Sequence, residues 1–460
     1  MTPQETVERA LALSKADGCV VIATERSEAN LRWAGNTLTT NGQMRSRSLT
    51  VIAIVAGTAG VSSGVIERST VSDDELEPLV RAAEQAAADA GPADDAAPLV
   101  EPSGPTTGWD DPVQETTIGV FTDVARGLGE AFGRARSAQR LLFGFAEHVV
   151  ETIYLGSSTG LRLRNAKPTG KFELNGKSTD LTRSAWVGAA TADFTDVNID
   201  AHENEIGRRL GWAERRVDLP AGRYETLLPP TAVADLLIFA YISASARDSD
   251  EGRTVYSKPG GGSRIGERLA NLPVTLRSDP GAAGLATTPF VVAGGSSNLF
   301  SAFDNGQPTG PTDWIRDGVL TALPTTRAWA ARSGGAVTPL IDNLILDGPE
   351  GGRSMDEMIA ATERGLLLTC LWYIRPVDPQ TLLLTGLTRD GVYLVEGGEV
   401  TAAVNNYRFN ESPVGMLDRL AEVGRTEVAL PREWNEFFSR TAMPAVRVGD
   451  FNMSTVSQAT

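Results

Sequence analysis

The sequence predicts an α+β fold, in which helices and strands are partly segregated along the chain. Runs of β-branched and apolar residues gather before residue 60 and again between residues 139 and 194, and an amphipathic helical pattern precedes each group. The second half adds alternating strands and a few capped helices. A parallel α/β sheet would require strict alternation of one strand with one helix, which this chain does not show.

The N-terminal part begins with the signature of a helix. Thr2 is a good N-cap, Pro3 suits the first helical position, and Glu5 completes a capping box. The dipeptide Asp17-Gly18 then ends the helical pattern. Three β-rich runs with turn residues between them predict a meander of strands. These runs cover residues 19–24, 28–33 and 48–55.

The same order of elements is then repeated. Residues 72–75 (SDDE) predict a second capping box that opens an Ala-rich helix. Residues 91–112 are rich in proline and glycine and predict a linker. An amphipathic helix over 118–132, a second group of strands and a helical segment around His202 follow. The pattern helix, meander, helix, meander is then complete.

We therefore predict an N-terminal domain of residues 1–220 and a C-terminal domain of residues 221–460. The second is predicted to be a mixed α/β domain rich in antiparallel strands. It begins with a strand, a strongly apolar helix over 231–246 and a glycine-rich loop. Further along, residues 354–366 predict a helix with a capping box, and the residues around Gly397-Gly398 alternate on both sides of the turn, as in a hairpin.

The composition excludes several classes of function. The 42 basic and 58 acidic residues give a net charge of −16, which disfavours binding to nucleic acid or to anionic lipid. No apolar run approaches the roughly 18 residues of a membrane span, and the N-terminus does not resemble a signal peptide. We expect a cytoplasmic protein. Two cysteines and two histidines cannot form a disulfide framework or a three-histidine metal site.

Short motifs supply no complete catalytic constellation. Two G-x-S-x-G matches place Ser62 and Ser158 as candidate nucleophiles, but no helix directly follows either serine, and both are expected in turns. His202-Glu203 begins like a metalloprotease helix without its second histidine, and a solvated helix face is the expected structure. His148 is expected either to have hydrogen-bond partners for its ring nitrogens or to lie at the surface. Cys370 is expected to be a small buried hydrophobic residue. We assign no catalytic residue and no metal ligand.

The C-terminal half contains several stretches that resemble one known family. Residues 303–309 (FDNGQPT) and 314–320 (WIRDGVL) are similar to the "D-D/N-E/G-G-x-P-T … L-I-x-x-G-x-L" stretch of the TldD/TldE (PmbA) metallopeptidases, also called the modulator of DNA gyrase family. Residues 342–348 and 354–359 resemble the family's "T-N-x-x-L-x-P-G-x-x-S-x-x-E-x-I". The hairpin over 392–400 is similar to its "A-Y-L-I-E-N-G-K-V". The resemblance runs through nearly the whole chain.

The resemblance implies a two-domain subunit that dimerises around a cavity for unfolded peptides. TldD-type subunits carry zinc on an H-E-x-x-x-H helix and on a later cysteine. The corresponding helix here is residues 231–246, which contain no histidine or glutamate, and no cysteine lies near Leu430. The chain therefore resembles a TldE/PmbA-type subunit. It would bind no cofactor itself and would pair with a zinc-bearing TldD-like paralogue, although a homodimer is also possible.

The family signature also supplies the candidate peptide-binding residues. By resemblance they form part of the cavity wall or a substrate-binding strand. They are Phe303, Asp304, Asn305, Gly306, Gln307, Pro308 and Thr309. Two alternatives remain open: a peptide-binding or scaffolding protein without a proteolytic role, and an independent hydrolase that uses Ser62, Ser158 or a carboxylate site.

Overall fold

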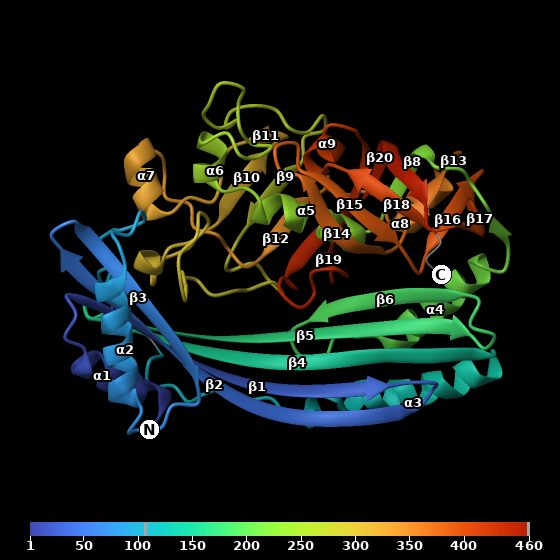
Figure 1. The fold of residues 1–460 in the computed structure, drawn as a ribbon. Coiled ribbons are helices and arrows are strands. Elements are labelled where there is room, and N and C mark those ends of the chain that lie inside the picture. The colour runs from blue at the N-terminus through green and yellow to red at the C-terminus, as the bar shows by residue number, and fades with distance from the viewer. Residues whose placement is uncertain (105–107, 458–460) are drawn as a thin grey trace.

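The computed structural model describes residues 1–104 and 108–457, and within them the strands form two sheets (Figure 1). The first sheet has six strands in the order β3-β2-β1-β4-β5-β6, and every neighbouring pair is antiparallel. Its strands are β1 (Gly18–Trp33), β2 (Leu38–Gly57), β3 (Gly60–Ser69), β4 (Arg140–Ser157), β5 (Arg162–Ser178) and β6 (Ser184–Thr191).

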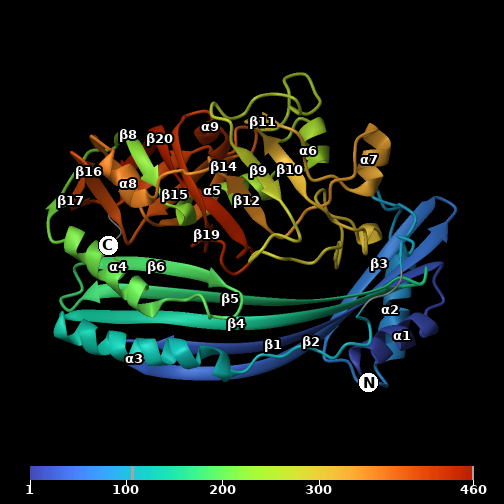
Figure 2. The same ribbon diagram turned by 180° about the vertical axis from the view of Figure 1, so that it is seen from behind.

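Four helices cover one face of this sheet. They are α1 (Pro3–Leu13) and α2 (Leu76–Asp89) at one end, and α3 (Thr122–Ser137), preceded by the short 3-10 helix η1 (Ile118–Phe121), with α4 (Ile199–Trp212) at the other. Cys19 and Val21 of β1 pack with α1 and α2, while Leu31 and Trp33 pack with α3 and α4. Since alternate residues of a strand face the same side, both helix pairs lie on one face. Figure 2 shows α3 and α4 in front of the strands.

No α-helix among the described residues packs on the opposite face of the first sheet, and we call it the helix-free face. At one end it is apolar: Ile22 and Leu155 pack against Phe290 and Ala302 of the second half of the chain. Further along it is polar, with Arg26, Glu147, Glu151, Lys167 and Lys171 lining cavities. This face therefore looks towards the second sheet, which lies above it in Figure 1.

The second sheet has 14 strands and is mostly antiparallel, with parallel pairs at β12–β20, β13–β8 and β17–β7. The strands are β7 (Arg216–Val217), β8 (Gly222–Leu228), β9 (Thr275–Ser278), β10 (Thr312–Arg316), β11 (Val319–Leu320), β12 (Leu344–Asp347), β13 (Arg364–Leu368), β14 (Leu371–Asp378), β15 (Leu383–Thr388), β16 (Val392–Glu396), β17 (Glu399–Val404), β18 (Tyr407–Glu411), β19 (Leu420–Ala429) and β20 (Thr441–Val456).

Helix α5 (Pro230–Ile242) is the centre of the larger hydrophobic core. Its side chains are buried on nearly all sides, among strands β8, β19 and β20. The shorter helices of this half are α6 (Ala246–Asp250), the 3-10 helix η2 (Ala302–Asp304), α7 (Arg327–Ser333), α8 (Met355–Ala360) and α9 (Pro413–Leu417). The α+β class predicted from the sequence is confirmed by this arrangement.

Several local predictions are wrong. Residues 19–24 and 28–33 form one continuous strand, because residues 25–27 keep their partners on both β2 and β4. Glu25 and Ser27 interrupt the apolar pattern on the helix-covered face because they lie between the two helix pairs, and Arg26 faces the other side. Helix α2 begins at Leu76, after the Ser72–Glu75 interaction rather than within it. Helix α8 ends at Ala360, and Leu366 belongs to strand β13.

The segment predicted as a linker has no helix or strand in its described part, and residues 105–107 lie outside the described residues. It is nevertheless well anchored to the second half. Asp95 accepts a hydrogen bond from the Ser301 hydroxyl at 2.6 Å, and the Pro98 carbonyl accepts one from Arg327 at 2.7 Å. The domain boundary at residues 220 and 221 falls between β7 and β8 and stays a prediction. None of the described helices has the length and apolar character that a membrane crossing demands.

Candidate functional site

The seven residues of the family signature, 303–309, form a largely buried turn beside the apolar end of the helix-free face. Phe303, Asp304 and Asn305 are at most 5% exposed, so very little of their side chains lies at the outer surface. The Asn305 amide holds the turn to a neighbouring segment: its Oδ1 accepts from Ala293 N at 2.7 Å, and its Nδ2 donates to Ala293 O at 2.8 Å. These residues fix the local backbone.

Asp304 is bound on both sides by Arg327, the first residue of α7. One carboxylate oxygen accepts from Arg327 Nε at 2.8 Å and the other from Arg327 N at 3.1 Å. Burial raises the pKa of Asp304 above its usual value, and these bonds oppose that rise. Asp304 and Thr309 also line a cavity of about 240 Å³ that reaches Lys167 on β5, which we call the Asp304 cavity. Gln307 and Pro308 are not among its lining residues.

Helix α5 and residues 432–434 are in direct contact, and these are the two segments that the sequence resemblance suggested for metal ligands. The Asp235 carboxylate of α5 is fully buried and accepts from Glu433 N at 2.8 Å and from Arg432 N at 3.2 Å. Trp434 Nε1 donates to the Asp235 carbonyl at 3.1 Å. Burial raises the pKa of Asp235 well above its usual value, and the two backbone N–H groups oppose this.

These residues do not fit a zinc ion. The two segments offer two carboxylates but no imidazole or thiolate. Glu433 is already engaged, because it accepts from the backbone N–H groups of Tyr373 and Ile374 at 3.1 Å. Throughout the described part of the chain, no group of three or more His, Cys, Asp or Glu side chains is placed to hold a metal ion.

The two histidines occupy separate structural positions. His148 is buried, with Nδ1 2.6 Å from the Thr116 hydroxyl and Nε2 2.7 Å from the Ala192 carbonyl, so both ring nitrogens are satisfied. His202 stacks on Phe172. Burial lowers the pKa of both histidines. The solvated helix face expected at His202-Glu203 is wrong for Glu203, which is 1% exposed and pairs with Arg140 at 2.6 Å.

The candidate nucleophiles are also structural. Ser62 lies inside strand β3 rather than in a turn, and its hydroxyl donates to Ala87 O of α2 at 2.6 Å. Ser158 lies in the turn between β4 and β5, as expected, where its hydroxyl accepts from Cys19 N at 3.0 Å. Burial raises the pKa of the Cys370 thiol to about 12. No imidazole contacts either serine, so no activated nucleophile is formed by these residues.

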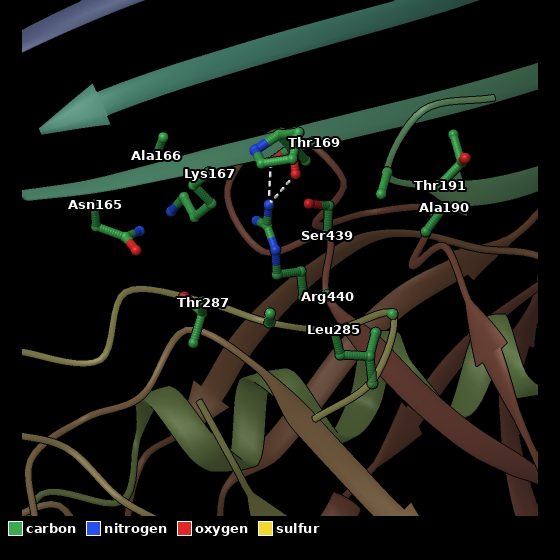
Figure 3. A pocket seen from close by; sticks show the side chains of 14 residues that line it. Asn165, Ala166, Lys167, Thr169, Ala190, Thr191, Leu285, Thr287, Ser439 and Arg440 are labelled. Atoms are coloured by element: carbon green, nitrogen blue, oxygen red, sulfur yellow. Dashed lines mark hydrogen bonds between the residues drawn. The ribbon is translucent and has the colours of Figure 1, made fainter. Parts of the chain in front are cut away.

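The structure reveals a cleft that the sequence did not predict. It lies between the helix-free face and the loops of the second half, and it contains three adjoining cavities that share Lys167. One is the Asp304 cavity. The second, of about 240 Å³, lies beside β5 and is lined by Arg440, and we call it the β5 cavity (Figure 3). The third, of about 220 Å³, is lined by Lys171 and is called the Lys171 cavity.

Ion pairs join the two walls of this cleft. Lys167 Nζ lies 3.0 Å from Asp342, and Lys171 Nζ lies 2.6 Å from Glu436. Lys171 is almost fully buried, and its second partner, Glu147 at 3.4 Å, has a pKa raised by burial. The cleft could not be predicted from the sequence, because the β5 residues and the loops that face them are far apart in the chain.

The fold and the site together define an α+β protein of two packed sheets with a polar cleft between them. The chain belongs to the PmbA/TldA metallopeptidase family: the model of the family's C-terminal domain matches residues 221–455. Among curated proteins no significant match is found.

Solved structures confirm the fold over nearly the whole chain. The structure of TldE from Thermococcus kodakarensis has a TM-score of 0.78 at 15% identity, covering 98% of this chain and 99% of that one. A protein from Thermotoga maritima described as a modulator of DNA gyrase gives 0.76 at 17% identity, covering 98% and 99%. A similarly described protein from Bacteroides thetaiotaomicron gives 0.75 at 14% identity, covering 99% and 98%.

Proposed function

We propose that this chain is a zinc-less subunit of a TldD/TldE-like metalloprotease complex that processes unfolded peptides. The observation that supports this most is the way in which the Asp235 carboxylate is hydrogen-bonded. On the helix where the sequence resemblance places metal ligands, the chain has a buried carboxylate whose two oxygens accept backbone N–H groups. A zinc-bound water is the nucleophile of such peptidases at neutral pH, and nothing in this region replaces it.

The cleft suits a supporting role in such a complex. It lies between a β-sheet face and loops, and it offers both charged and neutral polar groups along its length. An extended peptide can be held there mainly by its backbone, which makes binding tolerant of sequence. The signature residues 303–309 would then act indirectly, by fixing one wall of the Asp304 cavity.

The expected partner is a zinc-bearing TldD-like paralogue, with a homodimer of this chain as a further possible assembly. This chain would contribute no cofactor of its own, and neither nucleic acid nor membrane is an expected ligand. The net charge of −16 opposes direct contact with a phosphate backbone. We place the complex in the cytoplasm.

Reconstitution tests this function. Each subunit is purified alone, the two are mixed, and cleavage of unfolded casein is followed with and without a chelator. We expect cleavage by the mixture only, with loss on chelation. Full activity of the paralogue without this chain would contradict the proposal and favour a peptide-binding or scaffolding protein. Chelator-resistant cleavage by this chain alone would favour an independent hydrolase.

A matched pair of variants tests the role of the cleft. Ala190 lies at the β5 cavity, and Ala190→Trp should fill it and lower the cleavage rate of the mixture by about tenfold or more, since productive positioning of substrate is lost. Ala88→Trp adds the same ring at an exposed position of α2, remote from the cleft, and should leave the rate unchanged. Equal rates for the two mixtures would argue against the cleft.

A further inference from the structure

The β5 cavity differs in charge from the rest of this acidic molecule. Lys167 and Arg440 are the charged residues among those that line it, and both are cations. Its other lining residues are small, apolar or neutral polar. A cavity of about 240 Å³ is large enough for a short stretch of peptide or a single side chain rather than for a large cofactor. Lys167 is already paired with Asp342, so Arg440 supplies the positive charge that favours an anionic ligand here.

Arg440 has no carboxylate partner within 4.0 Å among the described residues. Its Nη2 donates to Pro168 O at 2.7 Å and also to the Thr169 hydroxyl, both on β5. By contrast, Arg447, which is also largely buried, pairs with Glu225 and Glu422, each at 2.9 Å. Burial lowers the pKa of Arg440, and the more distant carboxylates Asp342 and Glu151 oppose this only in part. Only Nη2 of the guanidinium is used in these hydrogen bonds, so its other N–H donors can bind a carboxylate, which a guanidinium does in a bidentate manner.

A second, independent feature of the same cavity is an unsatisfied hydroxyl. Thr287 is 94% buried and lines the cavity, and its Oγ1 has no hydrogen-bond partner among the described residues. A buried polar atom without a partner is costly, and it marks a place where a ligand or water can be bound. Figure 3 shows Arg440 reaching towards Thr169, with Lys167 beside it and Thr287 on the opposite wall.

The third feature is a free strand edge. Strand β6 pairs only with residues 170–177 of β5, so residues 162–169 of β5 have a strand neighbour on the β4 side alone. The Pro168 carbonyl accepts from Arg440 and therefore points away from β4. Since alternate residues of a strand direct their backbone groups to the same side, the N–H and C=O of Ala166 also point to the open edge. Ala166 lines the cavity.

We propose that the β5 cavity binds a carboxylate of an extended peptide, with the peptide backbone laid along the open edge of β5 and the carboxylate paired with Arg440. The Thr287 hydroxyl would donate to the same group. The inference rests on the proposed function, since it names the chemical group of the peptide substrate that the same cleft would bind. A peptide can supply the carboxylate from its C-terminus or from an Asp or Glu side chain, and both have the same chemistry.

Fluorescence anisotropy with three decapeptides of Ala, Ser, Gly and Val, each labelled at the N-terminus, tests the inference. The first has a free C-terminus, the second a C-terminal amide, and the third an amide with one internal Glu. We expect the first or the third to bind at least about tenfold more tightly than the second, as for a charge-assisted pair. Which of the two binds better tells whether the terminus or a side chain is recognised. Equal binding of all three overturns the inference.

Variants connect the preference to the named residues. Arg440→Gln should abolish the difference between the acidic and amidated peptides, whereas Lys177→Gln, which removes an exposed cation of β5 outside the cavity, should preserve it. Thr287→Val keeps the shape of the side chain and should weaken only the acidic peptides, by a few-fold, without loss of stability. It also serves as the second test if Arg440→Gln unfolds the protein. A preference that survives both Arg440→Gln and Thr287→Val overturns the inference.

The two proposals fail in different ways. If the chain shows no preference for carboxylate peptides but the reconstituted mixture still cleaves casein, the carboxylate site at β5 is wrong and the proposed function stands. If the chain prefers carboxylate peptides but no mixture cleaves casein, the proposed function is wrong and the chain is a peptide-binding protein. Absence of binding to all three peptides overturns the carboxylate site.

Discussion

At the scale of single residues, Asp235 shows how a fully buried carboxylate can hold two segments of the chain together. It lies inside the largest core, and each of its oxygens accepts a backbone N–H from residues 432 and 433. The segment that leads into β20 is thereby held against α5. Removing the acceptor leaves buried N–H groups without partners, which costs more than the bonds themselves contribute.

Asp235→Asn should therefore lower the free energy of unfolding by roughly 1–3 kcal/mol, because the amide offers one acceptor oxygen for two buried donors. Chemical denaturation of the purified chain measures this. Asp378→Asn is the matched control: Asp378 also accepts a backbone N–H, from Gln380, but is only partly buried. A loss no larger than that of the control would mean that Asp235 does not join the two segments.

His148 should make stability depend on pH. Burial lowers its pKa below the ordinary 6.5, so the unfolded chain binds a proton at a pH where the folded chain does not. Its stabilising contribution is complete above pH 6.5 and is lost as the pH falls through that value towards the lower folded pKa. The carbonyl of Ala192 needs a ring N–H, and the Thr116 hydroxyl can donate to the other, unprotonated nitrogen.

We expect the stability difference between the wild type and His148→Gln to shrink by about 1 kcal/mol or less between about pH 7.5 and about pH 5.5. Urea unfolding at both pH values gives the difference directly. Taking the difference between the two proteins removes the effect of carboxylates that titrate equally in both. A difference that stays constant, or grows as the pH falls, would contradict the assignment.

At the scale of elements, the sequence predicts helix starts and turns correctly where these depend only on contacts between neighbouring residues. The capping boxes at Thr2 and Ser354 are present as predicted, and the hairpin turns at Gly397-Gly398, because neighbouring residues alone determine these features. The Ser72–Glu75 interaction forms but precedes the helix. Strand β1 was divided in the prediction because the helices that cover its two ends are distant in sequence and leave polar residues between them.

The turn over residues 303–309 also depends on one glycine. Gly306 has φ +83°, and a Cβ there would lie 2.1 Å from Leu161 Cδ2 at the start of β5. The motif was identified from the sequence by resemblance, but its close contact with the first sheet could not be, because Leu161 lies in a different part of the chain. The signature therefore serves the packing of the two sheets in addition to lining a cavity.

Gly306→Ala should destabilise the protein by roughly 2–4 kcal/mol, since it combines a left-handed backbone with a steric clash. Gly262→Ala is a close control, because Gly262 has the same φ of +83° but no atom within 4 Å of the added Cβ. It should cost only the backbone part, about 1–2 kcal/mol. Thermal or chemical unfolding of both variants gives the difference, and equal losses would contradict the close contact with Leu161.

At the scale of the whole molecule, the sheets enclose a cleft whose residues come from distant segments. Lys167 and Lys171 on β5 meet Asp342 and Glu436 on loops of the second half. Composition and periodicity predicted the fold class, because these reflect the secondary structure of each segment. They contained no signal for the pairing of Arg440 with β5, because that contact exists only after both halves have folded and packed.

We propose that this chain binds no zinc and depends on a partner for catalysis. The most direct measurement is elemental analysis of the purified chain, alone and after incubation with zinc and desalting. We expect less than about one zinc per ten chains, because a stable site needs a preformed set of imidazole, thiolate or free carboxylate ligands. One tightly held zinc per chain, lost on His202→Ala or Asp235→Asn in a folded variant, would contradict it.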